Sequence, residues 1–497
     1  MTDLSALAPL SPRLSAPWLE RHGLVPLERA GDVVRVGSWR RGEEVDASAV
    51  DALELHFGAA VEVVPVSESA GRAAIRRLYG DGATARAVVD AMHADAGGAA
   101  DAEPRAIDDL VALANEAPVV RLVNLLLIEA LAARASDVHL EGYRDALRVR
   151  YRVDGVLQEA PSPPASLAAA VVSRLKIMAD LDVAERRLPQ DGRVRLKLQD
   201  RAVDVRVSTV PTLHGESVVL RLLEVERGRL SLAELGLEAD AAAAFERAIR
   251  RPHGIVLVTG PTGSGKTTTL YAAVDAIRTG REKIVTVEDP VEYELPGVPQ
   301  VPVQERIGVT FATVLRALLR QDPDIILVGE IRDPETAEVA TQAALTGHLV
   351  LSTLHTNDAV GALTRLLDLG IAPYLVVSTV EAALAQRLVR LVCASCAAPA
   401  SARDDERAVL GLPAGAELTR GRGCPDCRGT GYRGRTGLYE LLVLDDTLRA
   451  AVVRGASAPE LRDLAAHAGM TTLADHGLRL VRAGRTTLDE VLRVTRG

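Results

Sequence analysis

A glycine-rich segment with one lysine offers the clearest chemistry in this chain. Residues 260–267 read Gly-Pro-Thr-Gly-Ser-Gly-Lys-Thr, between a short apolar run at 255–259 and a helical pattern at 267–278. This is the G-x-x-x-x-G-K-[ST] pattern in its strand–loop–helix context, where backbone N–H groups converge on phosphate oxygens. Lys266 is expected to reach the β- and γ-phosphates of ATP, and the Thr267 hydroxyl to bind Mg²⁺. The candidate nucleotide-binding residues are Gly260, Pro261, Thr262, Gly263, Ser264, Gly265, Lys266, Thr267 and Thr268.

Two carboxylates follow other predicted strands of the same region. Glu292 comes after the apolar run 283–287, and Glu330 ends the segment 324–330, which has an apolar middle. The carboxyl ends of parallel strands meet at one edge of a sheet, which is where ligands bind. An acidic residue after a strand is usually a turn or a helix cap. Two such strand ends in one P-loop domain nevertheless favour catalysis, with carboxylates that hold Mg²⁺ and orient water.

A histidine follows a fourth predicted strand. The apolar run 349–353 ends just before His355, whereas His348 precedes the same run. A lone histidine is usually structural, but its place at the predicted ligand edge favours a functional role for His355. For His348 the sequence leaves the structural and the functional interpretation equal.

All four cysteines of the chain lie in two C-x-x-C pairs, which are separated by 27 residues. Four thiolates suit a tetrahedral metal, as in a zinc ribbon, although the gap is longer than the common spacing and requires a longer loop. A closed set of four ligands predicts a structural Zn²⁺ rather than a catalytic one. The candidate metal ligands are Cys393, Cys396, Cys424 and Cys427.

The elements that must position these groups change along the chain. From about residue 231, short apolar runs alternate with helical patterns, which is typical of a parallel α/β sheet. Residues 107–225 instead mix helical and strand patterns, which predicts an α+β domain. Within it, Ser166 is placed to cap a helix that runs to Leu181. Residues 1–92 have the pattern of a small α/β domain, and a small, acidic, Gly- and Pro-containing stretch follows them.

Composition excludes several classes of protein. The 497 residues are 48% hydrophobic and 25% charged, which indicates a globular chain of two to four domains. A net charge of −9 disfavours a dedicated nucleic-acid binder. No run approaches the ~18 apolar residues of a membrane span, and the first residues lack the pattern of a signal peptide. The cysteine pattern is not a secreted disulfide framework, so we expect a cytosolic protein.

The succession of motifs resembles a known family. The segments GPTGSGKTT, VEDPVEY, RQDPDIILVGEIRD and TGHLVLSTLHTND resemble the Walker A, Asp box, Walker B and His box of the secretion ATPases of the type II/type IV pilus superfamily. Upstream, ASDVHLE, RYRVDG, ERRLPQDGR and HGESVVLRLL resemble the amino-side domain of that family. The resemblance runs from about 107 to 497, whereas residues 1–106 resemble the family only loosely.

The resemblance implies a role for each matching residue. Glu292 would be the general base that polarises the attacking water, Glu330 would serve Mg²⁺ through bound water, and His355 would sense the γ-phosphate. Arg206 and Arg221 match the arginine fingers of the family, which the amino-side domain delivers across a subunit interface. A guanidinium there neutralises charge on the transferring phosphoryl group and makes hydrolysis conditional on domain closure.

The resemblance also implies an α/β architecture. It predicts a RecA-like P-loop NTPase domain with a tetracysteine zinc insertion, preceded by a PAS-like α+β domain and a small N-terminal α/β domain, with a connector at 224–231. The expected boundaries are 1–92 for a partner-docking domain, 93–106 for a linker, 107–225 for the PAS-like domain that supplies the arginine fingers, 226–390 for the ATPase core, 391–437 for the zinc module and 438–497 for a C-terminal helical subdomain.

Within the superfamily, the tetracysteine module narrows the expected function. Retraction ATPases typically lack it, whereas assembly and secretion ATPases carry it. We therefore expect a cytoplasmic, hexameric, Mg²⁺-dependent ATP hydrolase that drives pseudopilus assembly and protein export by a type II secretion system. The alternative is a type IV pilus assembly ATPase. Residues 1–92 are expected to dock on inner-membrane platform proteins, so that the chain is peripheral to the inner membrane through partners alone.

Two functions of other classes remain open to test. A nucleotide-regulated scaffold would bind ATP without useful turnover, but the presence of Glu292, Glu330, Arg206 and Arg221 argues against it. A DNA-translocating motor is disfavoured by the acidic charge balance and by the lack of a basic aromatic stripe.

Overall fold

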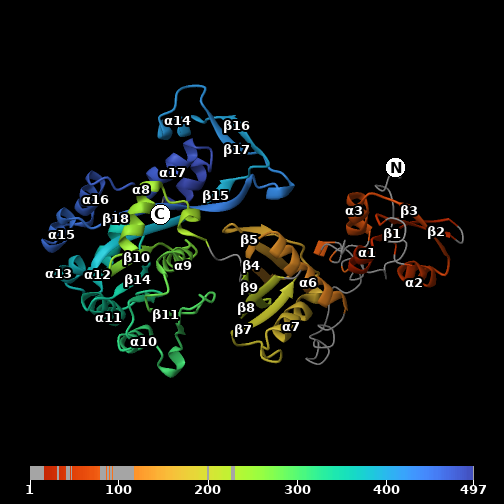
Figure 1. Ribbon diagram of the computed structural model, residues 1–497, viewed down its shortest axis with the longest axis horizontal. Helices are drawn as coiled ribbons and strands as arrows, with labels where there is room; N and C mark the ends of the chain where they lie inside the picture. Colours follow the sequence, from red (N-terminus) through yellow and green to blue (C-terminus); the bar gives the residue numbers. More distant parts are fainter. Residues whose placement is uncertain are drawn as a thin grey trace. The chain divides into compact units, whose positions relative to one another are not determined.

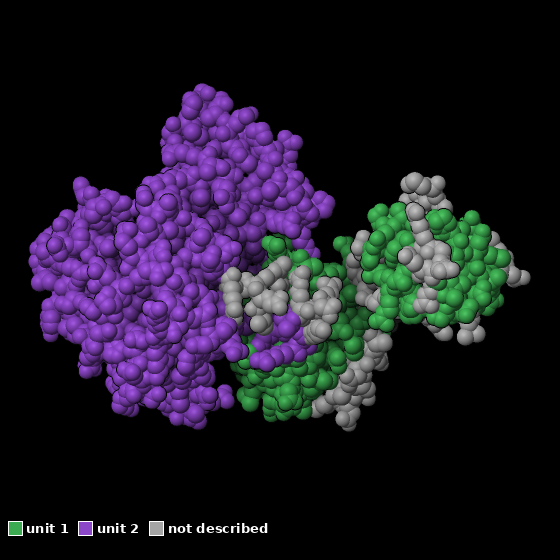
Figure 2. Space-filling view, viewed as in Figure 1, with its two compact units in different colours: residues 1–151, 157–194, 206–221 green, residues 152–156, 195–205, 222–497 purple. Residues whose placement is uncertain are grey.

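The computed structural model shows two compact units (Figures 1 and 2). One consists of residues 1–151, 157–194 and 206–221, and the other of residues 152–156, 195–205 and 222–497. The structure describes residues 16–495 apart from 31–32, 41–44, 46, 79–84, 87–88, 90–91, 93–116, 199–200 and 225–229. The predicted linker at 93–106 and most of the connector at 224–231 lie outside the described residues.

The N-terminal part of the first unit contains a three-stranded sheet in the order β1-β2-β3. Alternate residues of its strands pack against helices on its two faces, in two separate apolar clusters. Trp18 and Trp39 lie half-buried at these clusters, and the Arg72 guanidinium lies over the Trp39 ring. The elements are α1 (Ala16–His22), β1 (Leu24–Ala30), β2 (Val33–Ser38), α2 (Ala47–Phe57), β3 (Ala60–Pro65) and α3 (Glu68–Leu78). The expected small α/β arrangement is confirmed.

The second part of that unit is built on a six-stranded sheet in the order β6-β5-β4-β9-β8-β7. The strands are β4 (Ala135–Gly142), β5 (Leu147–Val153), β6 (Val156–Glu159), β7 (Gln190–Leu198), β8 (Arg201–Thr212) and β9 (Gly215–Glu224), with helices α6 (Ala117–Ala132) and α7 (Ala168–Met178). Tyr151, on β5, is fully buried and donates its hydroxyl hydrogen bond to the Leu126 carbonyl of α6. The predicted α+β character is confirmed.

The predicted helix cap at Ser166 is wrong. Residues Ala165–Leu167 form a 3₁₀ turn after Pro164, and α7 begins at Ala168, with Leu167 as an N-cap that makes no side-chain hydrogen bond. The helix also ends at Met178, before Leu181. A 3₁₀ turn at a helix start places the first α-helical residue further along the chain, which moved the cap position past Ser166.

The second unit contains a seven-stranded sheet in the order β12-β11-β13-β14-β10-β15-β18, in which only β18 is antiparallel to its neighbour. Its strands are β10 (Gly254–Thr259), β11 (Ile284–Glu288), β12 (Gln300–Pro302), β13 (Ile325–Val328), β14 (Leu349–Leu354), β15 (Val380–Val392) and β18 (Tyr432–Val443). The four strands predicted from apolar runs are confirmed within a few residues. β12, β15 and β18 were not predicted.

Both faces of this sheet are covered, which explains why its strands are apolar throughout. Ile255 and Leu257 of β10 belong to one apolar cluster, which includes α10 to α13, whereas Val256 and Val258 belong to the cluster with α8 and α9. The helices are α8 (Ala239–Ile249), α9 (Lys266–Ile277), α10 (Phe311–Leu318), α11 (Pro334–Leu345), α12 (Ala359–Asp368) and α13 (Pro373–Thr379).

The C-terminal region begins where β15 leaves the sheet (Figure 1). Its elements are β16 (Ala397–Ser401), α14 (Asp404–Leu410), β17 (Glu417–Gly421), α15 (Asp446–Val453), α16 (Ala458–His467), α17 (Leu473–Arg482) and α18 (Leu488–Thr495). Glu490, whose side chain is 3% exposed, anchors α18 to β15. Its carboxylate accepts hydrogen bonds from Arg390 at 2.6 Å and Arg493 at 2.9 Å. Burial alone would raise its pKa, but the two guanidinium groups outweigh burial and lower the pKa to about 2.

We expect Glu490→Gln to destabilise the C-terminal region by about 3 kcal/mol at neutral pH, because removal of one charge leaves Arg390 buried without its counterion. The pKa of Glu490 is lowered on folding, so its stabilising contribution is present above its unfolded pKa and is lost as pH falls toward its folded pKa. Thermal unfolding of the full chain should therefore show a gap between wild type and variant that narrows as pH falls below about 4.5. Glu335→Gln, which breaks the exposed pair with Arg316, is the matched control and should change little. A gap that stays constant over this pH range would contradict the assignment.

Candidate nucleotide site and metal centre

The phosphate-binding loop lies between β10 and α9, and strand β15 packs against two of its glycines. Gly260 and Gly265 have φ angles of 150° and 90°. A Cβ on Gly260 would lie 2.5 Å from the Gln386 carbonyl oxygen, and one on Gly265 would lie 2.8 Å from the Gln386 side-chain nitrogen. A side chain at position 260 would collide with the β15 backbone, and one at position 265 would displace the Gln386 side chain and is strained by the positive φ angle.

Lys266 begins α9 and folds back over the loop. Its Nζ donates to the carbonyl oxygens of Gly260 at 2.8 Å and Pro261 at 3.2 Å. Burial lowers the pKa of Lys266; Glu330 acts in the opposite direction, and Arg387 lowers it further. An ammonium group that has lost water and is held by neutral carbonyls can exchange them for phosphate oxygens, which are stronger partners.

Two polar residues of β15 complete the support of this loop, and the sequence did not single them out. Thr269 of α9 donates to the Gln386 side-chain oxygen at 2.7 Å. Arg387, 9% exposed, donates to the carbonyl and side-chain oxygens of Asn357 at 3.0 and 3.2 Å. Asn357 lies two residues after His355, so Arg387 connects β15 to the segment after β14. The sequence signal that could have identified them is the adjacent polar pair Gln386 and Arg387 within a mostly apolar run.

Glu330 and His355 lie together at the carboxyl edge of the sheet, as predicted. His355 Nε2 lies 3.1 Å from one Glu330 oxygen, and Arg332 Nη2 lies 2.6 Å from the other. The hydrogen bond to Glu330 raises the pKa of Arg332. Arg332 was missed by the sequence reasoning, because one more arginine in an arginine-rich chain carries no signal. The cluster combines a carboxylate, an imidazole and a guanidinium at the end of β13 and β14.

The segment after β11 is held by a buried carboxylate that is distinct from Glu292. Glu288 is 3% exposed and accepts hydrogen bonds from Thr286 at 2.6 Å, Gln300 at 3.0 Å and the Tyr271 hydroxyl. Burial and the nearby Glu288 carboxylate raise the pKa of Tyr271. The Tyr271 hydroxyl also accepts a hydrogen bond from the backbone N–H of Glu292. Glu292 itself is half-buried. Helix α9 and the Glu292 segment are therefore tied through Tyr271.

The remaining predicted residues lie elsewhere. His348 precedes β14, at the opposite end of the strand from His355; its Nδ1 lies 2.9 Å from the Ala343 carbonyl oxygen at the end of α11, which is a structural contact. Arg206 on β8 and Arg221 on β9 belong to the first compact unit, whereas the loop, Glu292, Glu330 and His355 all belong to the second. The structure therefore groups the predicted site residues into two sets.

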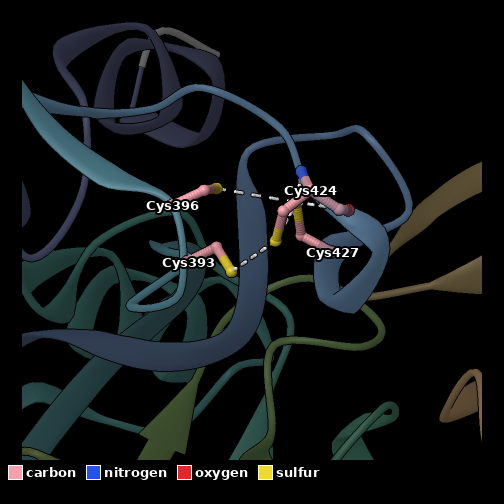
Figure 3. Close-up of side chains that lie close together, drawn as sticks. All are labelled: Cys393, Cys396, Cys424 and Cys427. Atoms are coloured by element: carbon pink, nitrogen blue, oxygen red, sulfur yellow. Dashed lines mark hydrogen bonds between the residues drawn. The ribbon is translucent and has the colours of Figure 1, made fainter.

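The four cysteines lie together, with their side chains directed toward a common centre (Figure 3). Cys393 and Cys396 follow β15, Cys424 precedes the 3₁₀ turn Pro425–Cys427, and Cys427 ends that turn. The Sγ–Sγ distances are 3.8 Å for Cys393–Cys424, 3.8 Å for Cys396–Cys427 and 3.7 Å for Cys424–Cys427. A tetrahedron of thiolates about 2.3 Å from a central Zn²⁺ has edges of about 3.8 Å.

The chemistry of the cysteine cluster also suits a metal. Burial would raise the pKa of Cys427, but hydrogen bonds from the backbone N–H groups of Cys424 and Gly431 outweigh it and lower the pKa to about 6. A thiolate is the form that binds metal. The donor set and its spacing therefore fit a structural Zn²⁺.

Comparison with known proteins identifies the family. The family model of the type II/IV secretion system protein matches residues 112–493, and that of the MshEN domain matches residues 2–85. The chain belongs to the type II/IV secretion system protein family. The predicted family and the P-loop ATPase fold are thereby confirmed.

Several curated relatives of this family cover most of the chain. The type II secretion system protein HxcR of Pseudomonas aeruginosa is 52% identical over 84% of this chain and 86% of its own length. The type II secretion system protein E of Xanthomonas campestris is 48% identical over 97% and 84%. The type IV pilus assembly ATPase PilB of Myxococcus xanthus is 47% identical over 95% and 84%.

Solved structures agree on the ATPase fold of the family. The pilus retraction motor PilT with bound ADP is 25% identical, with a TM-score of 0.51 over 75% of this chain and 97% of that one. The Legionella pneumophila ATPase DotB, 20% identical, has a TM-score of 0.57 over 76% and 96%, and shows the fold. Among the described residues, no helix combines the length and apolar character that a membrane crossing requires.

We expect Lys266→Ala to reduce ATP hydrolysis below about a tenth of the wild-type rate while the fold is kept, because the glycines and β15 set the loop and the lysine supplies the charge. Lys283→Ala is the matched control, since Lys283 is an exposed lysine of the same unit. Steady-state turnover and a circular dichroism spectrum decide the matter. A folded Lys266→Ala protein with near-normal turnover would refute the P-loop assignment.

We expect one zinc ion per chain when the protein is purified under reducing conditions. Chelation should unfold the region 391–437 and leave nucleotide binding unchanged, because thiolate ligation supplies much of the folding free energy of a segment with little apolar core. Elemental analysis measures the metal, and a fluorescent ATP analogue measures the pocket. Cys396→Ser should lose the metal. Absence of stoichiometric zinc in the wild-type chain would count decisively against the site.

Proposed function

We propose that this chain is the ATPase of a type II protein secretion system, and that it couples ATP hydrolysis to pseudopilus assembly and protein export. The observation that carries the proposal is the glycine loop, Glu330 and His355 in one ATPase domain of the type II/IV secretion family. Over nearly the whole chain, the type II secretion system protein E of Xanthomonas campestris is 48% identical and the pilus assembly ATPase PilB 47%. Over 78% of the chain, the type II secretion system protein E of Pseudomonas aeruginosa is 53% identical. We keep the pilus-assembly function as the second candidate.

ATP binding follows from the loop. The backbone N–H groups at the start of α9 and the Lys266 ammonium would hold the phosphates, and Arg387 would keep the loop in place from behind. Thr267 and Glu330 are the residues that would hold Mg²⁺, which neutralises phosphate charge when bound. Binding would replace the Lys266 contacts to Gly260 and Pro261 with contacts to phosphate.

Hydrolysis needs a group that orients water. Glu292 is the proposed general base, and the Tyr271 contact fixes its segment against α9. His355 contacts Glu330, so a γ-phosphate that reaches this edge would meet both side chains. We propose that His355 reports the presence of the γ-phosphate by a change in this contact.

Completion of the site requires the other compact unit. Arg206 and Arg221 are the proposed arginine fingers, delivered by the domain at 107–225 of a neighbouring subunit in a hexamer. A guanidinium that arrives only on domain closure would stabilise the charge on the transferring phosphoryl group, and turnover would follow domain motion.

The N-terminal domain is the proposed docking element. The MshEN match at residues 2–85 supports a separate folding unit before the ATPase, in agreement with the three-stranded sheet. We propose that it binds a cytoplasmic part of the inner-membrane platform and that the protein is cytoplasmic and reaches the membrane through this contact. A nucleic-acid partner is disfavoured by the net charge of −9.

We expect Arg206→Ala and Arg221→Ala each to lower turnover by about 10³-fold without a change in ATP affinity, because a finger acts on the transition state. Turnover is measured at a protein concentration that supports hexamers, and affinity with a fluorescent ATP analogue. In cells that lack the chromosomal gene, the wild-type chain should restore export of secreted proteins, and the variants should not.

Arg195→Ala is the matched control, since this arginine of the same sheet has an 83% exposed side chain. Normal turnover in both finger variants, or equal turnover of an isolated 232–497 fragment, would contradict the domain-gated mechanism. A scaffold without useful turnover would show no hydrolysis in the wild-type chain. Restoration of surface pili instead of export would favour the pilus alternative.

A further inference from the structure

Arg221 faces one acidic residue on the neighbouring strand. β4 and β9 are antiparallel, and Asp137 is directly opposite Arg221 in the register. Arg221 Nε donates to Asp137 Oδ1 at 3.1 Å, and the Ser136 hydroxyl donates to the other Asp137 oxygen at 2.8 Å. Asp137 is 7% exposed, whereas the Arg221 side chain is 55% exposed. A fixed, buried carboxylate thus holds the base of an outward-facing guanidinium.

The contact between Asp137 and Arg221 contributes little to stability but fixes the orientation of the guanidinium group. An ion pair with one partner half in water contributes little to stability. The hydrogen bond uses Nε, and among the described residues the two terminal nitrogens of Arg221 have no hydrogen-bond or ion-pair partner. A guanidinium has five N–H groups in a rigid plane, so a carboxylate at Nε fixes the plane and leaves the fork of terminal nitrogens for an anion.

We propose that Asp137 is a positioning residue that presents Arg221 to the phosphates of ATP. The proposal rests on the function of Arg221 proposed above. A free arginine must lose side-chain freedom when it meets the transferring phosphoryl group, and Asp137 removes part of that freedom beforehand. The effect appears in the chemical step, because the finger acts there, and leaves nucleotide affinity unchanged.

The test compares Asp137→Asn with Glu141→Gln in the full chain. Glu141 lies on the same strand, two alternations along the same face, and forms a similar ion pair with Arg150 of β5, so Glu141→Gln is the matched control. We expect Asp137→Asn to lower kcat by about 10- to 100-fold, with KM, the affinity for a fluorescent ATP analogue and the melting temperature unchanged. Glu141→Gln should keep the wild-type kcat.

The decisive readout is the coupling between the two residues. In an Arg221→Ala background, Asp137→Asn should cause no further loss of kcat, because no guanidinium remains to be positioned. Additive losses in this background would overturn the proposal, because Asp137 would then act elsewhere.

The remaining outcomes separate this proposal from the one on which it rests. Normal turnover of Arg221→Ala means that the finger assignment fails, and the positioning role fails with it. A slow Arg221→Ala with a normal Asp137→Asn overturns the positioning role alone. Faster turnover of Asp137→Asn also overturns it, because the pair would then restrain Arg221. Loss of melting temperature together with kcat would identify a merely structural contact.

Discussion

The nucleotide site depends on one packing constraint, the contact of β15 with the glycine loop. A Cβ on Gly260 would collide with the Gln386 backbone, and a Cβ on Gly265 would displace the Gln386 side chain. The Gln386 side chain of the same strand accepts a hydrogen bond from Thr269 of α9. Arg387, the next residue of the strand, donates a hydrogen bond to Asn357 in the segment after β14. The loop, the helix that starts with Lys266 and the segment that carries His355 therefore share one rigid support inside the sheet.

Glu288 and Glu292 are neighbouring carboxylates that differ in burial and in their surroundings. Glu288, at the end of β11, is closed in by Thr286, Gln300 and Tyr271 and serves the framework. Glu292, half-buried and four residues further on, keeps a carboxylate near the ligand edge. Glu288 therefore accepts hydrogen bonds from the framework of the protein, whereas Glu292 is the carboxylate for which we propose a role toward water.

The sequence predicted those parts of the site that are local in the chain. The glycine loop, the carboxylate and histidine after β13 and β14, and the cysteine pairs are each set by spacing over a few residues. Gln386 could not be found in this way, because its role comes from the packing of β15 against β10. Most residues of β15 are Ala, Leu, Arg, Gln or Glu, which favour helix, and the place of the strand in the sheet overrides that preference. The predicted helix cap at Ser166 is wrong for a local reason. Ser166 lies inside a 3₁₀ turn and therefore does not occupy the position before the helix.

The scarcity of aromatic residues has a spectroscopic consequence. The chain has two tryptophans, Trp18 and Trp39, and both lie in the small N-terminal domain, half-buried at the clusters that hold its helices. Emission excited at the red edge of indole absorption therefore originates in this domain alone. A change in its intensity or wavelength on addition of a partner reports an event at the N-terminal domain, free of any background from the nucleotide site. The unlabelled protein thus carries its own optical probe for docking.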